Sequence, residues 1–133
     1  MSIYTYSVDS QAFFLFNLLV QKVSALAPRL TAHYRQLQRQ LSRIGYLSQG
    51  SVIERRPNQQ GSRYIWTRKL QAKTVTVALS KEQYQWLRQA VTNQRKLERI
   101  VAQMQRSSHK ILFENFPEPR RRKSLSRRVL GLI

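Results

Sequence analysis

The side chains with the clearest binding chemistry in this sequence are cations and hydroxyls that alternate along one β-rich stretch, residues 62–79. Alternate residues of a β-strand share one face, so a sheet would display these groups together. Cations neutralise phosphates and release counterions. Threonine hydroxyls and arginine forks can reach base edges when strands lie in the major groove. The face that we predict to bind nucleic acid consists of Arg63, Thr67, Lys69, Thr74 and Thr76.

Further cations flank this face or follow it in the chain. Arg55, Arg56 and Lys73 lie near the ends of predicted strands, where they would contact neighbouring phosphates. A basic run near the C-terminus would tether the protein to DNA without reading its sequence, and a merely solvated charge run is the alternative interpretation. That run consists of Arg120, Arg121, Arg122 and Lys123.

The sequence offers no recognisable catalytic or metal-binding set. It has no cysteine, two histidines that lie far apart (His33 and His109), and six acidic residues that are scattered singly. Metal-dependent enzymes that cut or join nucleic acids need clustered carboxylates. We assemble no Ser/His/Asp set, acid–base pair or Gly-rich phosphate loop either. We therefore expect a binding protein without enzymatic activity, cofactor or metal.

The charge of the chain indicates a polyanionic partner. Lys and Arg total 24 against 6 acidic residues, a formal net charge of +18 over 133 residues. Such self-repulsion does nothing for fold stability, so DNA, RNA or an anionic membrane surface is the expected partner. Residues 1–28 have a formal net charge of zero, whereas residues 29–79 have a net charge of +9 and residues 117–133 a net charge of +5. The positive field is therefore centred on the middle of the chain and the tail.

The N-terminal part of the chain reads as two helices. A first helix over Ser10–Ala27, with Asp9 or Ser10 as N-cap, has apolar residues almost all round it. Such a helix must be buried in the core or in a dimer, and a membrane-surface helix is the alternative. The apolar run within it is too short to span a membrane. Pro28 ends or kinks this helix.

A second helix is expected over Arg29–Ile44, where apolar residues recur at helical spacing and Gly45 stands at the C′ position. A second face of this helix carries arginines one turn apart, which either contact phosphates or form an ordinary solvated face. Those arginines are Arg35, Arg39 and Arg43.

Over residues 46–79 the spacing of apolar residues changes from the helical period to the two-residue period of strands. Three β-rich runs, 50–56, 62–70 and 73–79, are separated by a turn cluster and by a two-residue connection, Gln71-Ala72. We predict a three-stranded antiparallel β-meander. Within its second strand we assign the face of Tyr64 and Trp66 to the core.

A long amphipathic helix follows the meander. Ser80 and Gln83 fit a capping box, and the apolar stripe continues to about Phe113, before Pro117. We expect the second half of this helix to pack on the N-terminal helices or on another copy of the chain. The predicted class is α+β, with an N-terminal helical region at 1–45, a meander-plus-helix unit at 46–116 and a basic tail at 117–133.

Several segments carry a resemblance to a known family. They are 50–52 (GSV), 64–69 (YIWTRK), 73–76 (KTVT), 79–83 (LSKEQ) and Asn93. Over roughly residues 33–106 the chain resembles small basic bacterial proteins of unknown function that occur beside transposase genes. Members of that family carry a cysteine cluster after the first strand. This chain has residues 55–60 (RRPNQQ) there instead, so no metal carries over.

The order of three strands and a helix, over about residues 50–95, also resembles the arm-binding domain of tyrosine integrases and the plant ethylene-response domain, which place the sheet in the major groove. These observations predict a non-catalytic accessory protein of a mobile element that binds duplex DNA, in the bacterial cytoplasm at the nucleoid. An RNA-binding protein is one alternative. A module that forms a homodimer or binds a transposase through apolar helices is the other.

Overall fold

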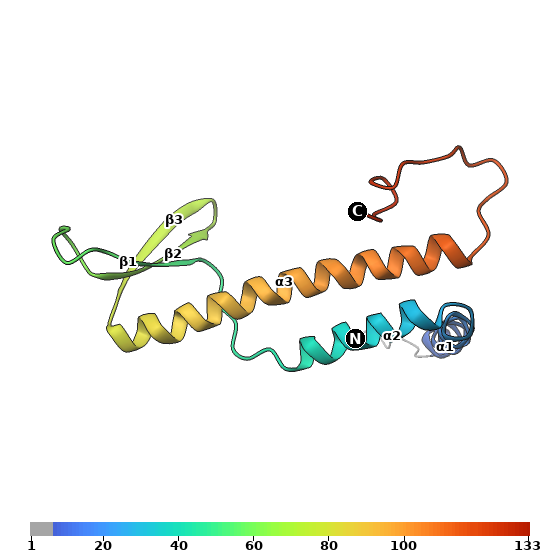
Figure 1. The fold of residues 1–133 in the computed structure, drawn as a ribbon, viewed down its shortest axis with the longest axis horizontal. Helices are drawn as coiled ribbons and strands as arrows, with labels where there is room; N and C mark the ends of the chain where they lie inside the picture. The colour runs from blue at the N-terminus through green and yellow to red at the C-terminus, as the bar shows by residue number, and fades with distance from the viewer. Residues whose placement is uncertain (1–6) are drawn as a thin grey trace. The chain divides into compact units, whose positions relative to one another are not determined.

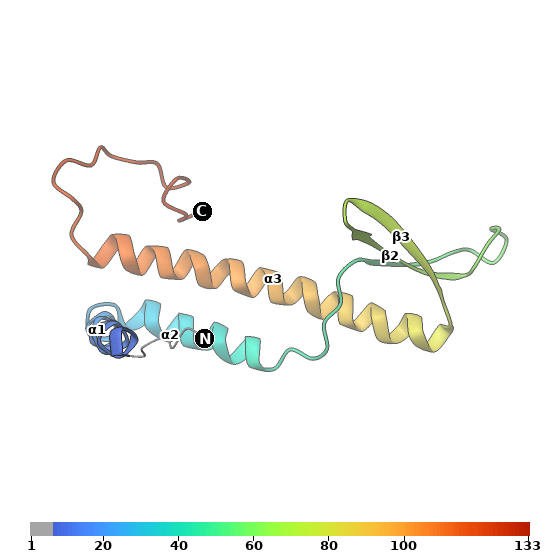
Figure 2. The ribbon, with the colours of Figure 1, turned by 180° about the vertical axis from the view of Figure 1, so that it is seen from behind.

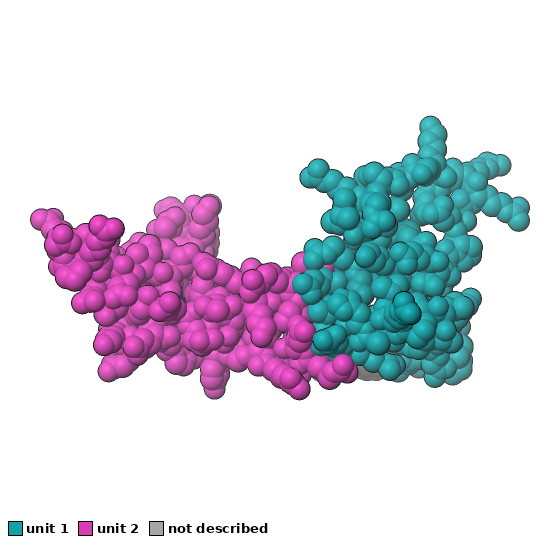
Figure 3. All heavy atoms as spheres, in the orientation of Figure 1, with its two compact units in different colours: residues 1–38, 103–133 teal, residues 39–102 magenta. Residues whose placement is uncertain are grey.

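The computed structural model describes residues 7–133, with the side chains described from Ser10 onward. Two helices come first, then three strands and a long helix. The chain divides into two compact units, one made of residues 1–38 and 103–133 and the other of residues 39–102 (Figure 3). Each unit is described by itself below. The α+β class predicted from the sequence is confirmed.

The second unit, residues 39–102, contains the predicted meander. Strands β1 (Ser51–Glu54), β2 (Tyr64–Leu70) and β3 (Lys73–Leu79) pair antiparallel in the order β1-β2-β3 (Figure 1). β1 is three residues shorter than expected: Gly50, which has a φ of 96°, and Arg55 and Arg56, which precede the turn cluster, lie outside the strand. Gly61, in this cluster, has a φ of 95°, which an L side chain rarely adopts.

The β2–β3 hairpin closes through the predicted two-residue connection. Gln71 and Ala72 both have positive φ, 48° and 64°. These are the left-handed angles of a type I′ turn, whose twist matches that of the flanking strands. Neither residue is a glycine or an asparagine, so the turn carries steric strain that the paired strands must offset.

Helix α3 (Lys81–Asn115) starts at the predicted capping box. The Gln83 backbone N–H donates to Ser80 Oγ at 3.1 Å, and the Ser80 N–H donates to Gln83 Oε1 at 2.9 Å. Because Ser80 directly follows β3, the capping box fixes where the chain leaves the sheet and enters the helix.

Aromatic contacts join the sheet to the first turns of α3. Tyr64 of β2 stacks on Tyr84 of α3, with ring centroids 4.7 Å apart. Tyr46, which precedes β1, lies 5.4 Å from Trp86. Val91 of α3 is buried in this unit. Tyr64 therefore contacts the helix, and both Tyr64 and Trp66, whose face we assigned to the core, are half-buried.

The outward face of the sheet differs from the prediction at its centre. Ile65, which alternation assigns to that face, is only 5% exposed and is the one strand residue that is buried. On the same face it lies between Ile53 of β1 and Ala78 of β3, its cross-strand partners. Side chains on a central strand are shielded from both sides. The outward face therefore has an apolar centre between its polar ends.

The connection from α2 to β1 corrects a second expectation. Helix α2 (Pro28–Ser42) ends two residues earlier than predicted, and Gly45 does not adopt the left-handed conformation of a C′ residue. Gly45 instead lets the chain pass close to α3, since a Cβ there would lie 3.2 Å from the Asn93 side-chain nitrogen. That nitrogen donates to the Tyr46 carbonyl oxygen at 2.9 Å.

In the first unit, the second half of α3 runs beside α2 and α1 crosses near its end, as expected (Figures 1 and 2). Helix α1 (Ser7–Leu26) begins earlier than predicted, so Asp9 and Ser10 lie inside it and neither is its N-cap. Pro28 opens α2 at a position where its missing N–H costs no hydrogen bond. In the described part of the chain no single helix has the length and apolarity to cross a membrane; only α1 and α2 together, bent by 115°, pass that test.

The apolar end of the tail is held against α3. The Leu132 N–H donates to the Arg127 carbonyl and the Gly131 N–H donates to the Arg128 carbonyl, the pattern of a Schellman turn. Gly131 has a φ of 69°, and its carbonyl oxygen lies 3.0 Å from His109 Nδ1. A Cβ at Gly131 would overlap the His109 ring, so the turn requires glycine there.

Candidate nucleic-acid interface

The register of the sheet brings most of the predicted face together. Thr67 of β2 pairs with Ser51 of β1 on one side and with Thr76 of β3 on the other, which forms a row of three hydroxyls across the sheet. The next row toward the hairpin pairs Lys69 with Thr74. Rows on one face lie about 7 Å apart along the strands. The hydroxyl row is therefore bordered by a cationic row.

The hairpin end carries the cations that are most available. Lys69 and Lys73 are both exposed. Within residues 7–133, neither ammonium group takes part in a hydrogen bond or an ion pair. Lys73 pairs with Leu70 and belongs to the opposite face by alternation, but it stands at the tip, directly after the turn. Both charges are free to meet an external anion.

Arg63, which directly precedes β2, departs from the prediction because its guanidinium contacts Glu54 and Tyr64, which pair with each other on the other face of the sheet. Its Nη2 donates to Glu54 Oε1 at 3.0 Å, with 53% of the Arg63 side chain and 43% of the Glu54 side chain exposed. The hydrogen bond that Arg63 donates to Glu54 raises the pKa of Arg63, and the nearby Tyr64 adds to the effect. The guanidinium also lies 5.6 Å from the centroid of the Tyr64 ring. An incoming phosphate would have to compete with Glu54 for this cation.

The two remaining cations of the sheet differ from each other. Arg55 donates from Nη1 to the Gln60 carbonyl at 2.8 Å, which holds the turn between β1 and β2 closed. Arg56 is exposed, and within the described residues only its backbone is bonded: its N–H donates to the Gln59 side chain and its carbonyl accepts from the Gln59 N–H. Of this pair, Arg56 is the one whose guanidinium is available to a partner.

The basic tail belongs to the first unit. Arg122 forms an ion pair with Glu118 at 2.8 Å and lies over the Phe113 ring, 5.4 Å from its centroid. Arg120, Arg121 and Lys123 are exposed, and within the described residues no hydrogen bond or ion pair involves their side chains. Three of the four predicted tail cations are therefore uncompensated.

Sequence reasoning missed one residue of the candidate interface and gave no role to a buried cation on the other face. Ser51 completes the hydroxyl row, and its place beside Thr67 depends on the β1–β2 register, which no local pattern reveals. Arg68 lies on the opposite face, where its guanidinium is 5.0 Å from the Trp66 ring centroid and its Nε is buried without a partner. The alternation of β2 predicted this placement, because Arg68 shares a face with Tyr64 and Trp66.

No family model, curated protein or solved structure matches the chain. No group of three or more His, Asp or Glu side chains gathers within residues 7–133 in a way that would hold a metal ion. The chemistry of the face itself therefore carries the functional inference.

Proposed function

We propose that this protein binds duplex DNA through the outward face of its sheet, as a non-catalytic protein. The observation that carries the proposal is the row of Ser51, Thr67 and Thr76, bordered by the unpaired ammonium of Lys69. Phosphates supply affinity and base edges supply discrimination, and this face offers groups for both. The resemblance to transposase-associated proteins favours an accessory role in a mobile element, and that role stays a prediction.

The dimensions of the sheet suit the major groove. Three strands about 4.8 Å apart place their outer backbones about 10 Å from each other. The major groove of B-DNA is about 12 Å wide. The short side chains of the hydroxyl row and of Ala78 leave the backbone free to approach the base edges. The longer Lys69 side chain would reach toward the phosphates at the groove edge.

The aromatic residues favour duplex DNA over single-stranded RNA. Stacking of unpaired bases needs aromatic rings on an open sheet face. Here Tyr64 is stacked on Tyr84, and the Trp66 indole N–H donates to the Gln49 carbonyl at 2.9 Å, with Arg68 over its ring. Neither ring lies on the outward face, which is therefore poorly suited to stacking.

A salt titration of duplex binding tests the proposal. We expect the double variant Lys69→Gln/Lys73→Gln to bind a duplex more weakly and to lower the slope of log affinity against log salt by about 2, since each phosphate contact contributes about 0.9. The matched control Lys81→Gln/Lys96→Gln removes two charges from α3 and should change both quantities less. Equal effects in the two variants would show that the sheet face is not the contact.

A second candidate function is self-association through α1. The exposed apolar surface of this helix favours self-association. Phe13, Phe14 and Phe16 are 67%, 64% and 62% exposed. Taking about 150–250 Å² for a whole aromatic side chain, these three leave roughly 300–500 Å² of apolar area in contact with solvent. The exposed aliphatic residues of α1 add to that area. An apolar patch of this size is often functional, and a stable interface buries about 800 Å² per partner.

A second copy of this chain fits α1 better than a membrane surface does. Membrane-surface helices carry a polar face rich in Lys and Arg, whereas Lys22 is the one cation of α1, and it lies over the Phe116 ring at 5.9 Å. A hollow of about 700 Å³ beside α1 is lined by apolar side chains of all three helices, including Leu19, Ile111 and Phe116. In a twofold dimer, the outer phenylalanines of each α1 would enter the hollow of the other copy.

A further inference from the structure

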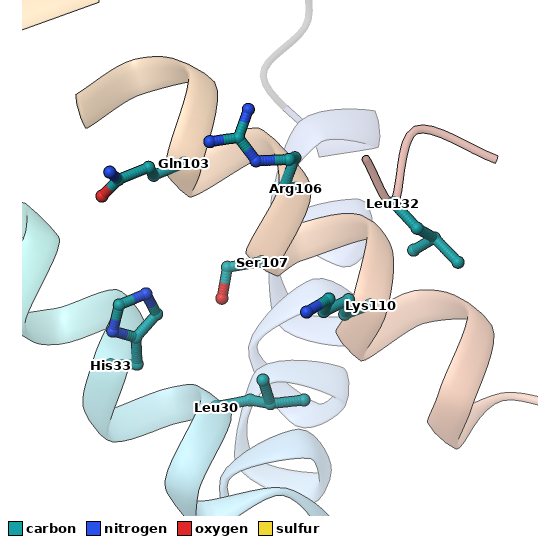
Figure 4. A pocket seen from close by; sticks show the side chains of 7 residues that line it. All are labelled: Leu30, His33, Gln103, Arg106, Ser107, Lys110 and Leu132. Atoms are coloured by element: carbon teal, nitrogen blue, oxygen red, sulfur yellow. The ribbon is translucent and has the colours of Figure 1, made fainter. Parts of the chain in front are cut away.

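A small cavity in the first unit has no part in the function proposed above. It has a volume of about 140 Å³ and opens to solvent between α2 and the second half of α3 (Figure 4). Two leucines, from α2 and from the tail, form apolar walls, and the other lining residues carry polar groups. The lining residues are Leu30, His33, Gln103, Arg106, Ser107, Lys110 and Leu132.

Ser107 lies at the centre of this cavity with an unsatisfied hydroxyl. The residue is only 4% exposed, and its Oγ has no hydrogen-bond partner. Figure 4 shows this oxygen pointing from α3 into the space beside His33 and Leu30. Buried hydroxyls in native proteins are almost always paired, and one left unpaired lowers stability. The geometry therefore calls for a partner that the protein itself does not supply.

The groups around Ser107 are donors, and two of them are cations. Gln103, Arg106, Ser107 and Lys110 are three or four residues apart and so share one face of α3. Arg106 and Lys110, one turn apart, repel each other, and neither forms an ion pair within the described residues. Glu114 lies one turn beyond Lys110 without pairing with it. His33 of α2 adds a ring N–H. Donors without a compensating acid define a site for an anion.

We propose that this cavity binds a phosphate group. Ser107 Oγ and the Gln103 amide would donate to its oxygens, Lys110 would neutralise its charge, and His33 would close the site from α2. The Arg106 guanidinium points away from Ser107 (Figure 4) and would add positive charge at longer range. The source is either inorganic phosphate or a phosphodiester of a bound nucleic acid, which present the same oxygens. Free-phosphate binding here does not depend on DNA binding by the sheet.

The test is a titration of the full chain with inorganic phosphate, followed by calorimetry and by the amide NMR shifts of α3. Saturable binding with shifts at Ser107 and Lys110 is expected. Ser107→Ala and Lys110→Gln should each weaken it by about tenfold, the loss of one hydrogen bond to a charged group. The control Lys96→Gln, which lies on α3 outside the cavity, should bind phosphate like the wild type.

Thermal unfolding with and without phosphate distinguishes a phosphate-binding role of Ser107 from a purely structural role. Phosphate should raise the melting temperature of the wild type and of Lys96→Gln more than that of Ser107→Ala, because binding to the folded state stabilises it by mass action. If the wild type binds no phosphate, or if Ser107→Ala binds it equally well, the proposal is overturned and the cavity holds water only.

Addition of duplex DNA to the phosphate-bound protein identifies the source of the phosphate. If a saturating duplex displaces bound inorganic phosphate, the site receives a nucleic-acid phosphodiester; if both bind together, it is a site for free phosphate. The Lys69→Gln/Lys73→Gln variant distinguishes failure of the sheet interface from failure of the phosphate site. That variant should lose duplex affinity while binding inorganic phosphate normally, so a failed sheet interface leaves the cavity proposal intact.

Discussion

At the scale of single residues, one carboxylate, that of Glu54, reduces the number of unpaired cations on the sheet. Glu54 is the only acidic residue in the three strands, and it pairs with Arg63. The Arg63 guanidinium is charged at every physiological pH, and the hydrogen bond to Glu54 raises the pKa of Arg63 further. Glu54 thereby lowers the net positive field at the end of the sheet that is far from the hairpin.

Glu54→Gln is expected to strengthen duplex binding. Removal of the carboxylate releases Arg63 for a phosphate and raises the salt slope of binding by about 0.9, the value for one added contact. Glu98→Gln, which removes the same charge from α3, is the matched control and should change the slope little. A fluorescence anisotropy titration at several salt concentrations measures both. If Glu54→Gln leaves the slope unchanged, Arg63 lies outside the interface.

At the scale of secondary-structure elements, the hairpin that presents Lys69 and Lys73 closes on strained residues. Gln71 and Ala72 adopt left-handed angles that asparagine and glycine adopt at lower cost. The strands persist because the β2–β3 ladder is seven residue pairs long. The position of the two lysines therefore depends on strand pairing more than on the turn.

The double substitution Gln71→Asn/Ala72→Gly is expected to stabilise the protein by about 1 kcal/mol, because it relieves left-handed strain at both turn positions. Urea unfolding followed by tryptophan fluorescence measures the change. The reference variant Gln59→Asn/Gln60→Gly alters similar residues in the neighbouring turn, where neither has a positive φ, and should give no gain. A loss of stability in the hairpin variant would mean that the turn is not type I′ in solution.

At the scale of the whole molecule, both compact units are basic. Residues 39–102 hold thirteen basic and three acidic residues, and the remaining residues hold eleven basic and three acidic. A dimer through α1 would double the charge and the number of sheet faces in one particle. Two linked sites bind one polyanion more tightly than either does alone, provided that both can engage.

Self-association is predicted to depend on the outer side chains of α1. Phe13→Ser/Phe14→Ser should convert a dimer into a monomer in sedimentation velocity, because it removes two of the most exposed apolar side chains of the helix. Val129→Ser/Ile133→Ser alters residues that are equally exposed, at 70% and 71%, and should stay dimeric. A monomeric wild type would refute the dimer. Binding of wild-type protein, but not of the α1 variant, to anionic vesicles would assign the helix to a membrane surface instead.

The sequence by itself determined the type and order of the elements and most of the candidate face. The capping box at Ser80, the alternation of β3 and the break at Pro28 act between residues that are neighbours in the chain, so their effects can be read locally. For the same reason the meander and most members of the candidate face, including Thr67, Lys69 and Thr76, could be predicted.

Only the tertiary structure decided which of those charges are available and where polar groups lack partners. Arg63 is paired because the β1–β2 register brings Glu54 to it across nine residues of sequence, and Ile65 is buried because two strands flank it. Ser107 has no distinguishing feature in the sequence of the long helix, and it is α2 and the tail that enclose it in a cavity. Such pairings depend on distances between segments that are remote in the chain, and no local pattern encodes them.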